Sequence, residues 1–354
     1  MRSNKNIRRG LVIAVAVSVA TIVVIFLVTM DRDTWSAIAK ISPVFFLLAL
    51  VLVTARQLVT CIRMRLLIQA MGSELSFGKT TKAVLGAGFA GSVTPYHAGG
   101  IPAEIYFLHS YGLTGGEATA VVTTGASLSI LLFTLLMPVA LVLSASRMHV
   151  SFGVRTLLVA ASIAALFFFL AFIYSMKEPE KLARVIEARA PGFLRKKPRF
   201  HRGVESFRRG MGDFSASLRA IMGAKKSLLF WIVLLTLAFW ACGFFVSPVI
   251  LWGVGYPELF WKAFLAQLVV SSLMPFVPVP GESGMAEAAF ATVFAVFVPK
   301  NLVGFMTLSW RFFMFYLEVL VLGIVFVVAV RDAGRAKDAR KESPVPDESP
   351  AVGP

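Results

Sequence analysis

The sequence predicts an all-α polytopic membrane protein with six full spans and two re-entrant helical hairpins arranged as an inverted repeat. Of its 354 residues, 57% are hydrophobic and only 15% are charged. A soluble chain of this length carries more polar surface, so a membrane protein is expected. The chain also holds long apolar runs, and two further apolar regions are each interrupted by proline and glycine.

The spans follow from length, because a helix needs about 20 apolar residues to cross the hydrocarbon layer. The first run, 11–30, is too long for a signal-peptide core and lacks a small-residue cleavage site, so it is interpreted as a retained span. The other long runs cover 43–59, 118–143, 154–176, 227–249 and 301–330.

Basic residues set the expected orientation. The chain carries 35 Lys and Arg against 19 Asp and Glu, and the segment 177–226 alone holds 14 against 5. Such segments stay cytoplasmic, as the basic N-terminus and the tail 331–341 should. We therefore expect a multi-pass protein of the cell inner (plasma) membrane with both termini in the cytoplasm, and no nucleic-acid partner. Arg56 and Gln57 are interpreted as snorkelling to headgroups.

This orientation constrains the two interrupted regions, 83–108 and 260–298. The first must enter and leave on the cytoplasmic side, and the second must enter and leave from outside. Hairpins that dip in from opposite faces are typical of inverted repeats. One transmembrane domain is thus expected over 1–330, followed by a basic and then disordered tail over 331–354.

Two interpretations of 177–226 stay open. Apolar residues alternate there with arginines, which predicts an amphipathic helix on the cytoplasmic membrane surface. An ordinary basic linker has the same composition.

The two interruptions have similar sequences. The first reads TPYHAGGIPAE over 94–104, and the second reads PVPGESGMAE over 278–287. Both fit the spacing Pro-x8-Glu with glycines between. Irregular backbone at membrane depth survives where protein buries it or where it lines a wet cavity. The alternatives are therefore a ligand site and a pair of tight turns that serve packing only.

A ligand site at these breaks would favour an anion. Glycines let backbone amides approach a ligand, Pro102 suits a first helical turn, and Ser283 suits an N-cap. Helix N-termini attract negative charge, and a lipid phosphate is the obvious anion in a membrane. The candidate substrate-binding residues are Pro95, His97, Gly99, Gly100, Glu104, Pro280, Gly281, Ser283, Gly284, Glu287 and Arg311.

The charged members of this set have alternative roles. Glu104 and Glu287 either complement helix dipoles or take up protons during transport, because charges in the apolar slab need partners or tasks. Arg311 either pairs statically with Glu287 or Glu318, or contacts substrate. His97 binds phosphate, relays a proton or only packs in its loop.

Enzyme signatures are missing from the sequence. It has no phosphate-binding loop, nucleophile elbow or metalloprotease motif, so an enzyme, a catalytic residue and a cofactor are not expected. Cys61 and Cys242 have no partner at metal-ligand spacing, so no metal site is expected either.

Two segments resemble the motifs of the lysylphosphatidylglycerol synthase transmembrane-region family. They are SVTPYHAGGIPAEIYFLHSYGLTGGEA, and PVPGESGMAEAAF followed by LSWRFFMFYLEVLVLG. The family includes the flippase-like domain at the front of the bacterial multiple peptide resistance factor, and the resemblance covers roughly 10–330. It implies a protein that moves lipids between leaflets. The family's transferase domain does not follow here, so a stand-alone form without lysyltransferase activity is expected. Glu282 departs from the small residues that relatives more often show.

The leading hypothesis is a flippase or transporter for a phospholipid with an anionic or zwitterionic headgroup. The alternative is a non-transporting membrane partner of a separately encoded lipid-modifying or glycosyl-transferring enzyme. A membrane-embedded synthase is a third hypothesis, although no nucleophile and base are evident. Membrane lipids, such an enzyme and a second copy of the chain are the partners considered.

Overall fold

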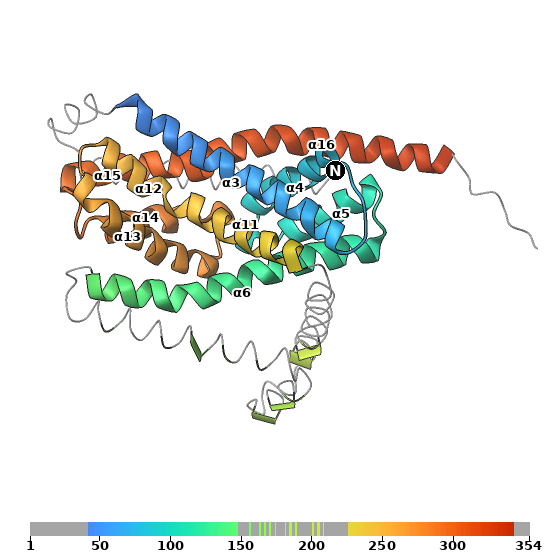
Figure 1. Ribbon diagram of the computed structural model, residues 1–354, viewed down its shortest axis with the longest axis horizontal. Helices are drawn as coiled ribbons and strands as arrows, with labels where there is room; N and C mark the ends of the chain where they lie inside the picture. The colour runs from blue at the N-terminus through green and yellow to red at the C-terminus, as the bar shows by residue number, and fades with distance from the viewer. Residues whose placement is uncertain are drawn as a thin grey trace, which may run out of the picture.

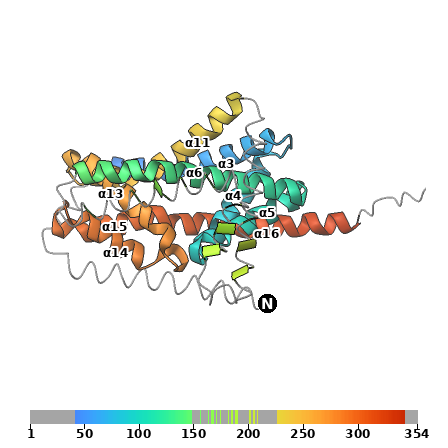
Figure 2. The same cartoon turned by 90° about the horizontal axis from the view of Figure 1, so that it is seen from below.

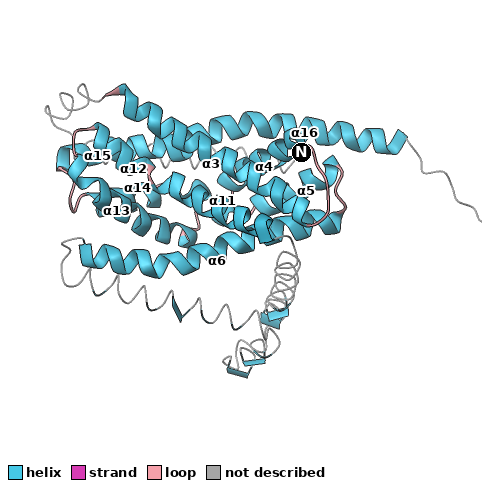
Figure 3. Cartoon of the chain, viewed as in Figure 1, coloured by secondary structure: helices cyan, strands magenta, loops and turns pink. Residues whose placement is uncertain are grey.

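The computed structural model describes residues 42–147 and 226–342, together with isolated positions between 156 and 208. These residues form helices and loops, with no strand among them (Figure 3). The expected span at 11–30 lies outside the described residues, and so do residues 343–354 of the tail for which disorder is expected. The same holds for most of the expected span at 154–176 and of the basic segment 177–226.

The long apolar runs form helices, either as one long helix or as two or more that follow each other directly. These are α3 (Pro43–Ala70), α6 (Gly115–Arg147), α11 (Lys226–Phe244), α12 (Val246–Gly253), α15 (Lys300–Arg311) and α16 (Leu317–Glu342). Within the described residues, four stretches are long and apolar enough to cross a membrane: Pro43–Ala70, Gly115–Leu136, Lys226–Gly253 and Lys300–Arg335. Four of the six predicted runs are therefore confirmed as long apolar helices.

Each interrupted region forms two shorter helices joined by an irregular segment. In the first, α4 (Phe77–Ser92) and α5 (Gly100–Tyr111) flank the 3-10 turn η1 (Pro95–His97). In the second, α13 (Phe260–Leu273) and α14 (Met285–Phe294) flank η3 (Met274–Phe276) and η4 (Pro280–Glu282). A further turn, η2 (Pro257–Leu259), precedes α13. The proline and glycine signals thus located both interruptions.

The same order of elements occurs twice, 185 residues apart. Adding 185 to the first residue of η1, α5 and α6 gives the first residue of η4, α14 and α15. Under the same shift, the residue range of α3 corresponds to that of α11 and α12 together, and the range of α4 corresponds to that of α13, to within a few residues. The chain therefore contains a structural repeat, although the two halves share little sequence outside the breaks.

Equivalent helices of the two halves pack against equivalent partners. α3 packs against its equivalent α11, and the two run in opposite directions (Figure 1). α4 packs on α16, while its equivalent α13 packs on α6. Figure 2 shows α4 and α5 at one end of the body and α13, α14 and α15 at the other. η1 and η4 are in contact, so the two breaks meet.

Apolar side chains point both inward and outward. One buried cluster lies around Phe290, Phe294 and Trp310 in the second half, and another around Leu67, Phe107 and Leu108 in the first. Large apolar side chains on the outer faces are exposed, Leu47 and Leu320 among them. A soluble protein rarely exposes so much apolar helix surface, whereas lipid would cover it.

Candidate functional site

The two breaks begin with the same backbone conformation over four residues, and they differ after that, since Ala98 is helical whereas Ser283 is extended. Thr94 and Val279 are extended, and a proline follows each. The next two residues of each break adopt the left-handed conformation, with φ of 54° and 55° at Tyr96 and His97, and 60° and 57° at Gly281 and Glu282. Residues other than glycine rarely adopt this conformation, and such strain concentrates at functional sites. The match indicates that the breaks are equivalent parts of the repeat.

This equivalence corrects the predicted spacing. The backbone aligns Pro95 with Pro280, not with Pro278, so the Pro-x8-Glu pattern does not pair equivalent residues. Under the 185-residue shift, Glu104 corresponds to Ala289 and Glu287 corresponds to Pro102. The scaffold is repeated, but its carboxylates are not.

A threonine closes the first break. The Thr94 hydroxyl accepts a hydrogen bond from the Gly99 amide at 2.8 Å and donates to the carbonyl of Ala90 at 2.9 Å. A Cβ at Gly99 would come within 2.7 Å of that carbonyl, so glycine is required by space. Gly100 begins α5, and a Cβ there would meet only ordinary contacts. Pro102 lies in the first turn of α5, as expected.

The second break is closed by a glycine and a carboxylate. A Cβ at Gly281 would overlap the ring of Phe315, and its φ is also positive. α14 begins after Gly284, whose amide donates to the Glu287 carboxylate at 2.7 Å. The N-cap is therefore Gly284 and not Ser283, because Ser283 is still extended and makes no cap bond.

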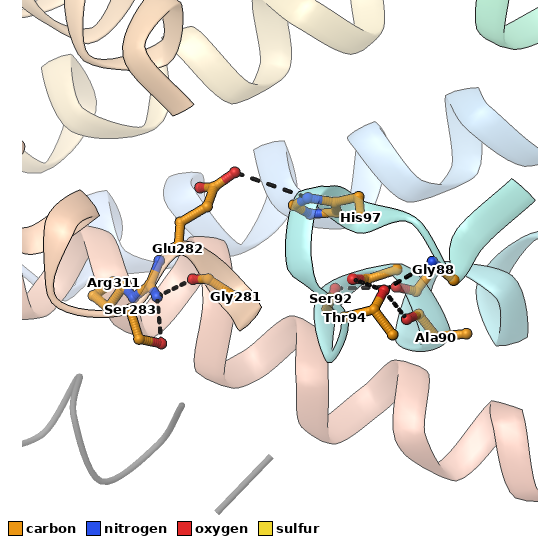
Figure 4. A network of polar contacts seen from close by, with 11 residues as sticks. Gly88, Ala90, Ser92, Thr94, His97, Gly281, Glu282, Ser283 and Arg311 are labelled. Carbon is orange, nitrogen blue, oxygen red and sulfur yellow. Dashed lines mark hydrogen bonds and ion pairs between the residues drawn. The ribbon is translucent and has the colours of Figure 1, made fainter. Parts of the chain in front are cut away.

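Arg311 anchors the second break. Its Nε lies 2.7 Å from the Glu287 carboxylate, and both side chains are buried. One terminal nitrogen donates to the carbonyl of Gly281 and lies 3.4 Å from the Ser283 hydroxyl (Figure 4). The guanidinium also covers the Phe315 ring, 4.0 Å from its centroid. The π-helical turn η5 (Phe312–Tyr316) follows Arg311 directly. Of the two predicted partners, Arg311 pairs with Glu287 and not with Glu318.

An ionisable pair joins the two breaks. Nδ1 of His97 lies 3.8 Å from the Glu282 carboxylate, as Figure 4 shows. The two residues are equivalent under the 185-residue shift, so they meet where the halves meet. More than half of the His97 side chain is exposed, and about a fifth of that of Glu282. This pair is the accessible part of the site, in contrast to the buried Arg311–Glu287 pair.

Arg56 completes the charged centre. Its guanidinium lies 2.5 Å from the Glu318 carboxylate, and Gln57 donates to the same oxygen at 2.8 Å. The interpretation of Arg56 and Gln57 as snorkelling residues is wrong, because their partner is a carboxylate of α16. Arg56 and Arg311 also both lie within electrostatic range of His97 and Glu282. Sequence reasoning missed this role, although an arginine in an apolar run was the available signal.

The structure therefore gathers most of the predicted residues. Pro95 and His97 of the first break lie near the second break through the contact of η1 with η4, and Gly99 follows them in the chain and packs against Ala90 and Thr94. Glu104 lies further along the chain, within α5, where the charge of Arg63 acts on it. Pro280, Gly281, Ser283, Gly284, Glu287 and Arg311 form the second break and its anchor.

The charged centre combines three carboxylates with arginine and histidine. Among the described residues, no group of three or more His, Cys, Asp or Glu side chains is placed to hold a metal ion. Guanidinium groups and a histidine instead suit oxyanions such as phosphate.

Comparison with known proteins places this chain in a family. Residues 11–322 match the family described as "Lysylphosphatidylglycerol synthase TM region". A protein of Archaeoglobus fulgidus described as "UPF0104 membrane protein" is 27% identical over 311 residues, which cover 87% of this chain and 93% of the relative. The matched region contains both breaks, Arg56, Arg311 and Glu318. The chain belongs to the lysylphosphatidylglycerol synthase transmembrane-region family.

Proposed function

We propose that this protein moves a phosphate-bearing lipid between the leaflets of the membrane. The observation that carries the proposal is the meeting of two irregular breaks around charged side chains, inside a body of apolar helices. Charges at membrane depth are costly, and in membrane proteins they commonly mark substrate pathways. Family membership supports a flippase-like role.

The proposed topology makes each interrupted region a re-entrant hairpin. α4 and α5 would enter from the cytoplasmic side, and α13 and α14 from outside, so the breaks meet near mid-membrane. With spans at 11–30 and 154–176 added to the four long helices, the chain has six spans and two cytoplasmic termini. The opposed directions of α3 and α11 support this inverted arrangement.

The lipid headgroup would bind at the His97–Glu282 pair. This pair is partly exposed and separated by 3.8 Å, so it is held less tightly than the buried pair of Arg311. A phosphate that approaches His97 would compete with Glu282 for it. Arg56 and Arg311, both within electrostatic range, would stabilise the added negative charge. The acyl chains would remain in lipid along the apolar outer faces.

A leaflet assay tests the proposal. The full chain is reconstituted into vesicles that carry a fluorescent phospholipid, and transbilayer movement is followed by quenching of the outer leaflet. We expect movement in the wild type, its loss in His97→Ala, and a changed rate in Glu282→Gln, which removes the carboxylate that competes with the phosphate. Lys82→Gln is the matched control, because Lys82 pairs with Asp332 near the surface, away from the breaks. Movement that is unchanged in both break variants would refute the proposal.

A crosslink tests whether the breaks must separate. Cysteines at 97 and 282, in a chain whose Cys61 and Cys242 are replaced by serine, should be joined by a short bifunctional methanethiosulfonate reagent, because their side chains lie close together in the wild type. The crosslink should stop lipid movement, and reduction should restore it. Movement that persists in the crosslinked protein would refute the idea that the breaks move apart. An enzyme that co-purifies with a chain inactive in the leaflet assay would favour the partner hypothesis.

A further inference from the structure

A second buried guanidinium lies on α3, beyond the charged centre. Arg63 is seven residues after Arg56, which is about 10 Å further along the helix. Its side chain is more than nine-tenths buried. One terminal nitrogen is 2.6 Å from the Ser129 hydroxyl and 3.4 Å from that of Thr236. Arg63 is therefore held between α6 and α11, well inside the bundle.

The hydrogen bonding of Arg63 is incomplete. Within the described part of the chain, its Nε is buried and has no hydrogen-bond partner. Guanidinium groups present five donors, and an unsatisfied buried donor costs about 1–3 kcal/mol. A buried cation with an unpaired donor would gain a charge-assisted hydrogen bond from an oxyanion.

Glu104 is the carboxylate whose charge acts on this arginine. Arg63 and Glu104 are close enough for their charges to interact, but they form no direct ion pair. Among the described residues, Glu104 makes no hydrogen bond, whereas Glu282, Glu287 and Glu318 all have partners. The Cys61 thiol is the other titratable group that faces Glu104. Glu104 is thus free to gain a proton without breaking a bond.

The remaining charged groups around α5, and its histidine, have partners elsewhere. They lie on α4, on α6, on α16 and at the end of α5 itself. Lys82 pairs with Asp332, Lys79 donates to the carbonyl of Tyr111, Glu117 caps α6 through Thr114, and His109 bonds the carbonyl of Leu113.

One aromatic ring connects Arg63 to the charged centre. The guanidinium of Arg56 lies 4.5 Å from the centroid of Phe239, and that of Arg63 lies 5.9 Å from the same centroid. The two cations therefore flank a single ring. In the second half, the positions equivalent to Arg56 and Arg63 are Ala241 and Pro248, so only one half of the repeat carries this column of positive charge.

We propose that Arg63 and Glu104 form a second anion site, which accepts the phosphate of a lipid headgroup when Glu104 is protonated. An ionised Glu104 neutralises Arg63 and repels a phosphate. A protonated Glu104 leaves Arg63 as an uncompensated buried cation, and the phosphate supplies the missing charge. The site would hold the headgroup before or after the breaks, one step closer to the cytoplasmic side. This inference rests on the proposed function for one point, that the phosphate belongs to a lipid. The attraction between Arg63 and a phosphate does not depend on that function.

Binding at Arg63 is measurable without transport. The full chain is labelled at arginine nitrogen, purified in a phosphate-free maltoside detergent, and titrated with short-chain phosphatidylglycerol. Its phosphodiester does not titrate near neutral pH, so any pH dependence belongs to the protein. The Arg63 Nε–H resonance, assigned by its loss in Arg63→Gln, should shift on titration. The apparent affinity should rise about tenfold or more between about pH 8 and about pH 5.

Substitutions distinguish the role of the Glu104 carboxylate from that of other nearby charges. Glu104→Gln should bind with high affinity at every pH, because the competing charge is gone. Glu74→Gln removes an exposed carboxylate and should keep the pH dependence of the wild type. Arg65→Gln removes an exposed cation two residues from Arg63 and should leave the Arg63 resonance and its shift unchanged.

The outcomes identify the ligand or overturn the site. A shift with lipid and with inorganic phosphate assigns the site to the phosphate group, and a shift with lipid alone assigns it to the intact lipid. A folded protein whose Arg63 resonance responds to neither overturns the inference, and so does pH dependence that survives in Glu104→Gln. A response at Arg63 without leaflet movement would refute the proposed function alone, and movement without a response would refute this inference alone.

Discussion

Removal of the carboxylate from Glu287 should destabilise the protein strongly. Glu287 is fully buried, and its oxygens serve both Arg311 at 2.7 Å and the Gly284 amide at 2.7 Å. In Glu287→Gln, the side-chain amide still accepts from the glycine, but Arg311 becomes an uncompensated buried cation. Loss of one partner of such a pair costs about 3–5 kcal/mol. Glu282, which is also within range of Arg311, offsets only part of this cost.

The matched control is an exposed pair with similar geometry. Lys82 and Asp332 approach to 2.5 Å, but their side chains are 42% and 29% exposed. Water screens such pairs, which are worth about 0–1 kcal/mol. Asp332→Asn should therefore change stability little.

The assay is thermal unfolding in detergent, followed by the loss of monodisperse protein on size exclusion. We expect the midpoint of Glu287→Gln to fall by about 5 °C or more, and that of Asp332→Asn to change by about 1 °C. The double variant Glu287→Gln, Arg311→Met should recover part of the loss, because no buried charge then remains. Equal effects of the two single carboxylate changes would refute the assignment of Arg311–Glu287 as the buried anchor.

Three further changes test the geometry of the breaks and of the charged centre by the same unfolding assay. Gly281→Ala should destabilise more than Gly72→Ala, because both have positive φ but only the first would place a Cβ against an aromatic ring; equal losses would contradict the close approach. Tyr96→Gly should stabilise by about 1 kcal/mol, since glycine relieves the left-handed backbone at an exposed side chain; a loss of stability would show that the ring is needed. Glu318→Gln should destabilise by about 1–3 kcal/mol because it leaves Arg56 without its charged partner, and Arg56→Met in the same chain should reduce that loss.

The sequence predicted the features that depend on local composition. Apolar length predicted runs at 43–59, 118–143, 227–249 and 301–330, each of which lies within the longer helical stretches of the structure, and proline with glycine located both breaks. Arg311 was also recognised, because a guanidinium in an apolar run requires a partner nearby. These features need no knowledge of which segments meet.

The pairings could not be predicted, because they depend on the packing of distant segments. Glu318 meets Arg56 across 262 residues, and nothing near Arg56 in the sequence indicates that partner. The register of the repeat was misjudged for a similar reason. Pro278 and Pro280 are two residues apart, and only the left-handed pair after Pro280 shows which of them matches Pro95. The direct contact of His97 with Glu282 likewise required both halves in place.

The uneven distribution of charge over a repeated scaffold has an energetic consequence. If the two halves were identical, exchanging their conformations would give a state of equal energy, and neither opening would be preferred. Here Arg56, Arg63 and Glu104 have no charged equivalents in the other half, and neither have Arg311 and Glu287. If the protein alternates between two conformations, as proposed, those conformations should therefore differ in free energy even without a ligand, and the charges of these residues should contribute to the difference.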